Sequence, residues 1–495
     1  MMTFNEIPTN WLDPAVFGEV KPNYTKKGVL AYPEKTIVVS QKLAGGTLTA
    51  GRIVEVTRAD EGYAHFGEGS IGAEQVVAFR KANKSTPLYV MAMDDAAGAT
   101  AATGTITFAG ATSVSSTLYF KIGGRRVYIT ALATDTPTAL ATKLAAAVNA
   151  DTRCVASATS ALGVVTLTAK NKGACGNEIN VRVDRKAADL PAGLTATIVD
   201  MAGGATNPNL QTALDAIDVS WFTKICVPWN DTANLQLLDT WLKARYVATA
   251  KLDCHGFVYK SGTFGQRTTF GDLTNCAFVT CGGLYRSPTS PWVHAATAMA
   301  VASFFLTQDP ARQLKSLVLP GVEAPDPADQ DTQEERNFLL QHGMSADICM
   351  DDGTVVINRM ITTYKKTTLN VADDAWLDIM VPATNSRIRY DWSGYVNLTY
   401  PRAKLVDDDR AVSVRRAEGD TAAGAAVVSP RIMKGAWASR CQVYERNVWI
   451  ENVQETLAMS IFERDADTRN RMNSKQVYQI VGNLMVQAAS LEFLV

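Results

Sequence analysis

The chain has 495 residues, which is too long for a single hydrophobic core, so roughly two to four domains are expected. Hydrophobic residues make up 47% of the chain and charged residues 20%, a composition typical of an ordinary soluble globular protein. The formal net charge of −1 excludes a strong overall electrostatic attraction to nucleic acid or to an anionic membrane.

The sequence predicts neither secretion nor a membrane-spanning helix. Its first residues, MMTFNEIPTNWLDP, contain no basic stretch followed by an apolar one, so a signal peptide is not expected. The longest apolar stretch, His294 to Leu306, is too short to cross a bilayer and instead predicts a buried helix. Scattered cysteines favour free, mostly buried thiols in a reducing compartment, which indicates the cytoplasm. These cysteines are Cys154, Cys175, Cys226, Cys254, Cys276, Cys281, Cys349 and Cys441.

Residues 1–30 are expected to form an extended N-terminal arm. Prolines interrupt this segment, and apolar residues stand isolated in it, among them Phe4, Ile7 and Trp11. Because exposed aromatic side chains are unfavourable in water, an arm that carries them is expected to dock on another surface.

Alternating strand and helix patterns predict an α/β domain made of residues 31–95 and 205–365. Two of its helices have a recognisable start, at Asp231 in one case and at Thr332 with Glu335 three residues later in the other. The turn Asp352-Gly353 predicts a β-hairpin. Other predicted strands lie at 36–39, 53–56, 88–93, 222–229, 255–259, 277–281 and 316–321, and other predicted helices at 73–82, 210–217 and 292–306.

Residues 96–204 are rich in Ala, Thr and Gly and predict a β-rich module inserted into the α/β domain. Short alternating strands such as TLYFKIGG and RRVYITA are punctuated by glycine. One helix is predicted inside the module, with Thr136 as its N-cap and Pro137 in its first turn. Linkers of small residues, AAGATAAT and GGATNPN, mark the two edges of the module.

Residues 366–495 are expected to form a C-terminal domain that mixes helices, around 375–400 and 430–447, with strands. The chain then ends on the alternating sequence LMVQAASLEFLV, which predicts a strand-like arm. Because chain termini normally fray, an apolar strand at this place is expected to join a sheet. The alternating residues singled out for self-assembly are Leu484, Val486, Leu491, Phe493 and Val495. The predicted class is therefore a multidomain α+β or α/β protein with mixed-sheet core domains, an inserted β-rich domain and extended arms at both ends.

Gly67-Glu68-Gly69-Ser70-Ile71-Gly72 matches the pattern G-x-G-x-x-G of a dinucleotide-binding loop. In such a loop the glycines directly follow a strand, whereas the preceding predicted strand ends near Val56, well before Gly67. Glu68 would also bring a negative charge toward the phosphates. A structural turn is therefore the favoured interpretation, and a nucleotide-binding enzyme built on this motif is kept as an alternative.

Catalysis and metal binding are not predicted from the histidines, cysteines and carboxylates. Cys254 and His255 with Cys276 and Cys281 do not match a zinc-ligand spacing, and these cysteines lie in apolar strands. His294 lies on the predicted buried helix, where a hydrogen-bonded core residue is expected. Clustered aspartates fall in predicted turns and polar loops. Basic residues form no stripe interleaved with aromatics, so direct contact with nucleic acid is not expected.

Several stretches resemble the Mu-like contractile phage tail sheath proteins. One is HFGEGSIGAEQVVAFRKANKSTPLYVMAM, in which a turn of the form F-G-x-G-S precedes a helix and an apolar strand. The most specific stretches lie in the last third of the chain: ITTYKKTTLNVADDAWLDIMVPATNSRIRYDW, YPRAKLVDDD, VVSPRIMKG and FERDADTRNRMN. The opening F-x-x-I-P of Phe4, Ile7 and Pro8 also resembles the family, as does the inserted module. The resemblance explains Gly67–Gly72 as a structural turn.

The resemblance implies a structural subunit without enzymatic activity or cofactor. Such a subunit stacks in hexameric rings around the tail tube and contracts to drive the tube through the host envelope for DNA ejection. Its implied partners are further copies of itself, the tail tube protein, the baseplate and the tail terminator, with no direct contact to nucleic acid and no membrane insertion. Its implied location is the tail of the virion, and the host cytoplasm during assembly. The two terminal arms would add strands to sheets of neighbouring subunits. Another phage structural protein, such as a capsid or non-contractile tail component, is the second alternative.

Overall fold

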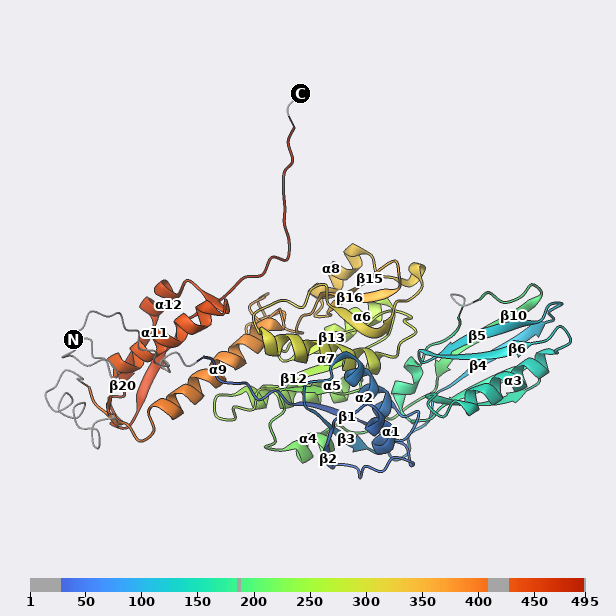
Figure 1. Ribbon diagram of the computed structural model, residues 1–495, viewed down its shortest axis with the longest axis horizontal. Coiled ribbons are helices and arrows are strands. Elements are labelled where there is room, and N and C mark those ends of the chain that lie inside the picture. Colours follow the sequence, from blue (N-terminus) through green and yellow to red (C-terminus); the bar gives the residue numbers. More distant parts are fainter. Residues whose placement is uncertain (1–27, 185–187, 408–426, 494–495) are drawn as a thin grey trace, which may run out of the picture. The chain divides into compact units, whose positions relative to one another are not determined.

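The computed structural model describes residues 28–184, 188–407 and 427–493 (Figure 1). These residues fall into two compact units. The smaller unit contains residues 28–31, 390–407 and 427–479, and the larger unit contains the rest. The predicted division into 31–95 plus 205–365, 96–204 and 366–495 stays a prediction about independently folding domains.

A mixed six-stranded sheet forms the centre of the larger unit, with the strand order β13-β12-β11-β1-β3-β2. All its neighbouring strands are parallel except β2, which is antiparallel to β3. The central strand β1 is buried along its whole length, as expected for a parallel sheet covered on both faces. The strands are β1 (Thr36–Gln41), β2 (Ile53–Val56), β3 (Leu88–Met93), β11 (Lys224–Cys226), β12 (His255–Tyr259) and β13 (Val279–Gly282).

Helices flank this sheet, and their starts follow the predicted caps. The Asp231 side chain accepts a hydrogen bond at the start of α5, and Thr332 and Glu335 form the predicted capping box of α8. The predicted apolar helix is α7, and in the described ranges no helix is long and apolar enough to cross a membrane. The helices are α1 (Asp60–Phe66), α2 (Ile71–Ala82), α4 (Gln211–Ile217), α5 (Thr232–Tyr246), α6 (Phe264–Gly271), α7 (Pro291–Gln308), α8 (Gln333–Gln341) and the short η2 (Pro327–Asp329).

A second, three-stranded sheet of the larger unit contains β14 (Val318–Glu323), β15 (Ala346–Cys349) and β16 (Thr354–Arg359). Strands β15 and β16 form the predicted antiparallel hairpin. Gly353 in its turn has φ +84°, a left-handed conformation that glycine adopts without steric cost.

Residues 103–202 supply a β-sandwich module with the strand orders β10-β4-β8-β7 and β6-β5-β9 (Figure 1). The rings of Phe108 and Phe120, one from each sheet, pack edge to face with centroids 5.8 Å apart in the buried core. Thr136 caps α3 as predicted. The elements are β4 (Thr103–Gly110), β5 (Ser116–Ile122), β6 (Arg125–Ala131), α3 (Pro137–Ala150), β7 (Ala156–Ala161), β8 (Val164–Ala169), η1 (Ala174–Glu178), β9 (Val181–Val183) and β10 (Leu194–Ala202).

The smaller unit combines helices with short strands. The long helix α9 (Met380–Thr399) begins in the larger unit and ends in the smaller one. The remaining elements are β17 (Lys404–Leu405), β18 (Val427–Val428), α11 (Pro430–Arg446), β19 (Ile450–Glu451), α12 (Val453–Met459), β20 (Ile461–Arg464), β21 (Met472–Lys475) and β22 (Gln479–Ile480). Several sheets with helices between them confirm the predicted mixed, multidomain fold class.

Candidate assembly surfaces

The glycines of the motif at 67–72 form a tight structural turn between α1 and α2. Gly67 and Gly69 have φ +87° and +76°, and a Cβ on Gly69 would lie 2.4 Å from the carbonyl oxygen of Cys154. The first amides of α2 are already bonded: Ile71 N donates to Asn171 Oδ1 at 3.0 Å, and Ala73 N donates to Ser70 Oγ at 3.1 Å. Because these are the donors that a phosphate would need, the turn is built to hold α2 against the module.

His255 and His294 are buried in the core. His255 Nε2 lies 2.8 Å from Thr280 Oγ1, and that hydroxyl donates to the carbonyl oxygen of Ile361, so the imidazole Nε2 is the donor toward Thr280. Burial, with a smaller contribution from Lys224, lowers the pKa of His255 to about 3, so the ring stays neutral at physiological pH. His294 Nε2 lies 3.1 Å from Asp347 Oδ2, and both side chains are 3% exposed.

The cysteines of the described residues are all free, and burial raises the pKa of several thiols, to about 12 for Cys254 and Cys281. Within 28–184, 188–407 and 427–493, no three His, Cys, Asp or Glu side chains gather in a way that could hold a metal ion. Buried neutral thiols are inert toward oxidation and metals, and they act here as small apolar core residues.

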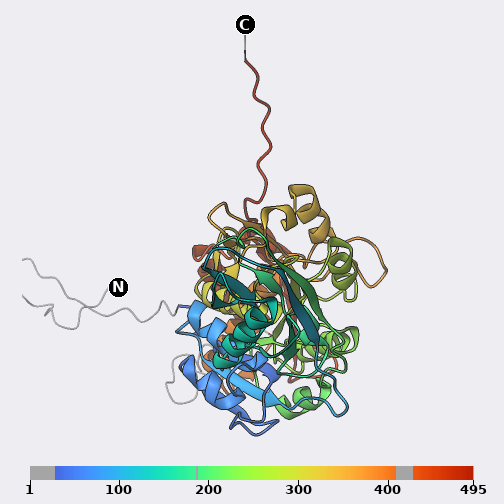
Figure 2. The same cartoon turned by 90° about the vertical axis from the view of Figure 1, so that its right-hand side faces the viewer.

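The C-terminal tail, residues 481–493, forms neither helix nor strand and leaves the rest of the larger unit (Figures 1 and 2). The singled-out residues Leu484, Val486, Leu491 and Phe493 are 80%, 82%, 94% and 85% exposed. Such a run of exposed apolar side chains is unfavourable in water and marks a surface for association. The other singled-out residues, Phe4, Ile7, Trp11 and Val495, lie outside the described residues.

Asn483 fixes the start of this tail. Its side-chain amide donates to the carbonyl oxygen of Ala311 at 2.9 Å and accepts from Gln313 N at 3.2 Å. Lys315 Nζ reaches the carbonyl oxygen of Met485 at 3.4 Å. Since these contacts end at residue 485, the tail is anchored at residues 483–485, and the apolar segment that follows makes no such contact with the rest of the larger unit.

A two-stranded antiparallel hairpin, β20–β21, is the clearest strand acceptor of the smaller unit. Its register pairs Ile461 with Lys475 and Arg464 with Met472, and its sheet contains no further strand among the described residues. Ile461 is 54% exposed. A lone hairpin is only marginally stable and leaves both outer edges unpaired, so an additional strand would both complete and stabilise it.

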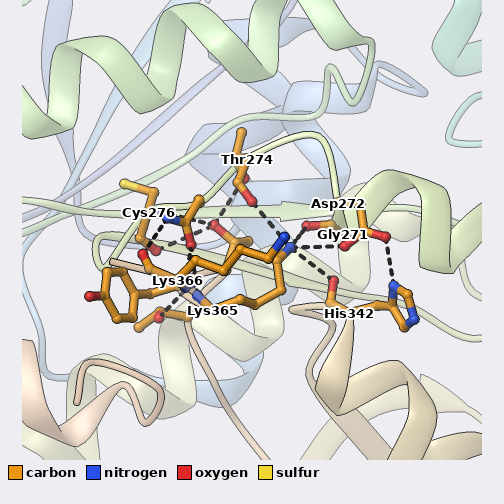
Figure 3. A network of polar contacts seen from close by, with 11 residues as sticks. Gly271, Asp272, Thr274, Cys276, His342, Lys365 and Lys366 are labelled. Carbon is orange, nitrogen blue, oxygen red and sulfur yellow. Dashed lines mark hydrogen bonds and ion pairs between the residues drawn. The ribbon is translucent and has the colours of Figure 1, made fainter. Parts of the chain in front are cut away.

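Lys365 joins three segments of the larger unit (Figure 3). Its ammonium group donates to the carbonyl oxygens of Gly271 at 2.7 Å, Thr274 at 3.2 Å and His342 at 3.4 Å, and it lies 3.1 Å from Asp272 Oδ1. Gly271 is the last residue of α6 and His342 caps α8, so one cation satisfies carbonyls at two helix C-termini.

Asp272 completes this network by accepting a hydrogen bond of 2.6 Å from His342 Nδ1. Burial by itself would raise the pKa of Asp272, but the hydrogen bonds from His342 and Lys365 hold it below its usual value. Burial also lowers the pKa of Lys365 despite its contact with Asp272. The carboxylate therefore stays charged at neutral pH and compensates the ammonium group.

Lys365→Met should lower the free energy of unfolding of the larger unit by about 2–4 kcal/mol, because it leaves buried carbonyl oxygens and Asp272 without their cation. Lys366→Met is the matched control, since Lys366 is exposed and contributes backbone groups to Asn275. Its expected effect is below about 0.5 kcal/mol. Urea titration followed by circular dichroism measures both, and equal stabilities of the two variants would contradict the role given to Lys365.

Comparison with known proteins finds similarity to phage tail sheath proteins. Residues 203–363 match the phage tail sheath protein central domain. The chain is 28% identical over 494 residues to the Mu-like prophage FluMu tail sheath protein of Haemophilus influenzae, covering 100% of this chain and 99% of that protein. Among solved structures, a sheath tail protein from Desulfitobacterium hafniense has 12% identity and a TM-score of 0.47, covering 94% of this chain and 100% of that one. The helical sheath of the anti-feeding prophage in its contracted state has 11% identity and a TM-score of 0.46, covering 97% and 98% of the two chains.

The full-length relative and the matched central domain agree with each other and with the residues that carry the resemblance. This similarity supports both the predicted resemblance to sheath proteins and the predicted absence of an enzymatic role, because a sheath protein is a structural component of the tail. Residues 203–363 therefore match a phage tail sheath central domain, the whole chain is similar to a Mu-like prophage tail sheath protein, and the chain is a structural subunit of a tail sheath and not an enzyme.

Proposed function

We propose that the chain polymerises as stacked hexameric rings around the tail tube and contracts to drive the tube through the host envelope for DNA ejection. The observation that carries this proposal is the free apolar tail 486–493, which follows a fixed anchor at Asn483 and lacks a sheet of its own. The similarity to phage tail sheath proteins supports it.

The tail of one subunit adds to the β20–β21 hairpin of another. Strand addition supplies main-chain hydrogen bonds that depend little on side chains, so such a link survives when neighbouring subunits rotate and slide. The alternating residues Leu484, Val486, Leu491 and Phe493 then set the register against the hairpin. The N-terminal arm, with Phe4, Ile7 and Trp11, is proposed to act in the same way.

Contraction draws its free energy from subunit contacts and not from a nucleotide. A metastable extended lattice reaches a state of lower free energy when its subunits exchange small contacts for larger ones. The remaining proposed partners are the tail tube protein, the baseplate and the tail terminator. The subunit is made in the host cytoplasm and ends in the tail of the virion.

Negative-stain electron microscopy of the purified protein tests this function. The expected result is wide hollow cylinders with regular transverse striations, which only a sheath forms. Thin solid filaments or closed shells would support a different structural protein. Micromolar binding of NAD or ATP in calorimetry, abolished by Gly69→Val, would support the nucleotide-binding alternative.

Deleting residues 96–204 should leave a protein that still forms cylinders, because the module pairs its strands only within itself among the described residues. The isolated module should unfold in one cooperative transition, since its sandwich core buries its own aromatic pair Phe108 and Phe120. Electron microscopy of the deletion variant and a thermal melt of the isolated module measure both. A folded deletion variant that never assembles would contradict this expectation.

A further inference from the structure

Two carboxylates lie where the β-sandwich module meets the rest of the larger unit, and only one of them has a cation. Glu178, at the end of η1, accepts a hydrogen bond from Ser261 N at 3.1 Å and pairs with Lys260 Nζ at 3.5 Å. Glu74 on α2 accepts a hydrogen bond of 2.8 Å from Trp292 Nε1 and, among the described residues, forms no ion pair. The negative charge that lacks compensation at this joint is therefore that of Glu74.

A cavity of 170 Å³ has both Glu74 and Arg125 in its wall. The module borders it with the turn Gly123-Gly124, which joins β5 to β6. The φ angles of these two glycines are +55° and +81°, as a two-residue hairpin turn of type I′ requires. Because this tight turn and the strand that follows fix the backbone of Arg125, its long side chain is the part that can move within the cavity.

Arg125 is paired within the module in the structure. Its Nε donates to Asp151 Oδ2 at 2.7 Å and its Nη2 donates to Asp151 Oδ1 at 3.1 Å, where Asp151 is the residue that ends α3. The Asp151 side chain is 27% exposed and also accepts a hydrogen bond of 3.1 Å from Arg153 N. Because water reaches this carboxylate, the loss of the guanidinium would cost it little.

The Glu74 carboxylate needs a counter-charge as soon as it ionises. Burial raises its pKa to about 7, although the charges of Arg125 and Lys170 act against this rise. Above that pH an unpaired negative charge lies in the cavity, where the effective dielectric constant is lower than in water and a charge is poorly solvated. A guanidinium that enters the cavity removes this penalty.

The other titratable groups around Glu74 are engaged elsewhere or carry no positive charge. They are Tyr63, Lys81, Cys154, Lys170 and Glu323. Lys81 is exposed and lies two turns, about 10 Å, further along α2, and Lys170 Nζ donates to the carbonyl oxygen of Thr152 at 2.6 Å. Glu323 has the same sign as Glu74 and pairs with Lys121, and burial raises the pKa of Cys154, so its thiol stays neutral. The ring of Tyr63 lies under the guanidinium of Arg153, 4.4 Å from its centroid. Arg125 is therefore the cation that can reach Glu74 at the lowest cost.

We propose that Glu74 and Arg125 form a proton-controlled ion-pair switch at the joint between the module and α2. While Glu74 is protonated, Arg125 stays paired with Asp151 inside the module. When Glu74 loses its proton, the Arg125 guanidinium turns through the cavity to the Glu74 carboxylate, and Asp151 keeps water and the amide of Arg153 as its partners. The exchange ties the β5–β6 turn to α2, so the pH of the surroundings sets how firmly the module is attached.

Fluorine NMR of the full-length protein labelled with 5-fluorotryptophan, at a concentration below that of cylinder assembly, follows the switch through Trp292. The chain has nine tryptophans, and Trp292→Phe identifies the resonance. Because the Trp292 indole donates to Glu74, this resonance should shift with a midpoint near pH 7, and Glu74→Gln should abolish the shift.

Asp151→Asn tests the exchange itself, because it removes the competitor for Arg125 and should lower the midpoint by at least about 0.5 pH unit. Arg125→Met should raise the midpoint, and in that background Asp151→Asn should move it by less than about 0.2 pH unit. Glu323→Gln is the matched control, since it removes a carboxylate of the same cavity that pairs with Lys121, and it should also move the midpoint by less than about 0.2 pH unit.

A Trp292 resonance that does not titrate between about pH 6 and pH 8 would overturn the proposal. An unchanged midpoint in Asp151→Asn would show that Arg125 does not turn to Glu74 and would overturn it as well. Equal shifts by Asp151→Asn with and without Arg125 would have the same consequence, because Asp151 would then act on Glu74 directly and not through an exchange of partners.

Discussion

Removal of residues 484–495 should leave a folded, soluble subunit that forms no cylinders. Within the described tail, hydrogen bonds to the rest of the larger unit end at residue 485, and Leu491 and Phe493 are 94% and 85% exposed. The tail therefore contributes little to the stability of its own subunit. In the proposed lattice, the same residues supply the strand that links subunits, so their loss removes the link.

Sedimentation velocity and negative-stain images of the truncated protein measure this effect, with circular dichroism as the check on folding. Phe493→Asp should also weaken assembly strongly, because it places an unpaired charge in a packed interface. Glu492→Gln is the matched control, since successive side chains of a strand point to opposite faces. Normal cylinders from the truncated chain would show that the tail is dispensable, and global unfolding would show that it packs within its own subunit.

Local chemistry explains the parts of the fold that the sequence predicted well. Thr136, Asp231 and Thr332 each accept a hydrogen bond from a backbone amide at the start of a helix, and such caps depend on a few neighbouring residues. The buried strands of the central sheet contain short apolar runs, such as Ile37-Val38-Val39 in β1, for a similarly direct reason. In contrast, β7 has the sequence ASATSA and was not predicted, because only the partner strand β8 and helix α3 hold it in place.

The candidate surfaces show the same limit. The apolar alternation of the tail can be read from the sequence. Its proposed acceptor is a strand edge, which consists of backbone groups that every residue carries, so the sequence gives no signal for it. Lys365 was not predicted as a network centre, since its partners are mainly carbonyl oxygens of Gly271, Thr274 and His342. The motif at Gly67–Gly72 matched a nucleotide loop in letters alone, because α1 and not a strand precedes it.

The second large effect is expected at Asp391, which is 0% exposed in the smaller unit. Its carboxylate accepts hydrogen bonds from Leu30 N at 2.7 Å, from Arg440 Nε at 3.0 Å and from Tyr444 Oη at 2.6 Å. Burial, followed by the charge of Asp391, raises the pKa of Tyr444, so its hydroxyl remains a donor. Asp391→Ala would remove the carboxylate that pairs with the guanidinium of Arg440, a residue that is 3% exposed.

Breaking such a buried pair from one side costs about 3–5 kcal/mol, whereas replacing both partners by apolar residues costs much less. Asp391→Ala should therefore destabilise the smaller unit by that amount, and the added change Arg440→Met should recover part of the loss. Asp407→Ala, which removes the exposed partner of Arg464, is the control and should cost below about 1 kcal/mol. Urea titration followed by tryptophan fluorescence measures these changes, and the Trp437 ring, 6.2 Å from that of Tyr444, contributes the signal of this unit.

Asp391 also links stability to assembly through Leu30. The bond from Leu30 N fixes the last residue of the predicted N-terminal arm, residues 1–30, to the smaller unit. A loosened anchor increases the conformational freedom of the arm and with it the entropic cost of docking on a neighbour. Asp391→Ala should therefore raise the protein concentration needed for cylinders even at temperatures where the unit stays folded. If Asp391→Ala loses the expected stability but assembles at an unchanged protein concentration, the bond between Leu30 and Asp391 does not affect docking of the arm.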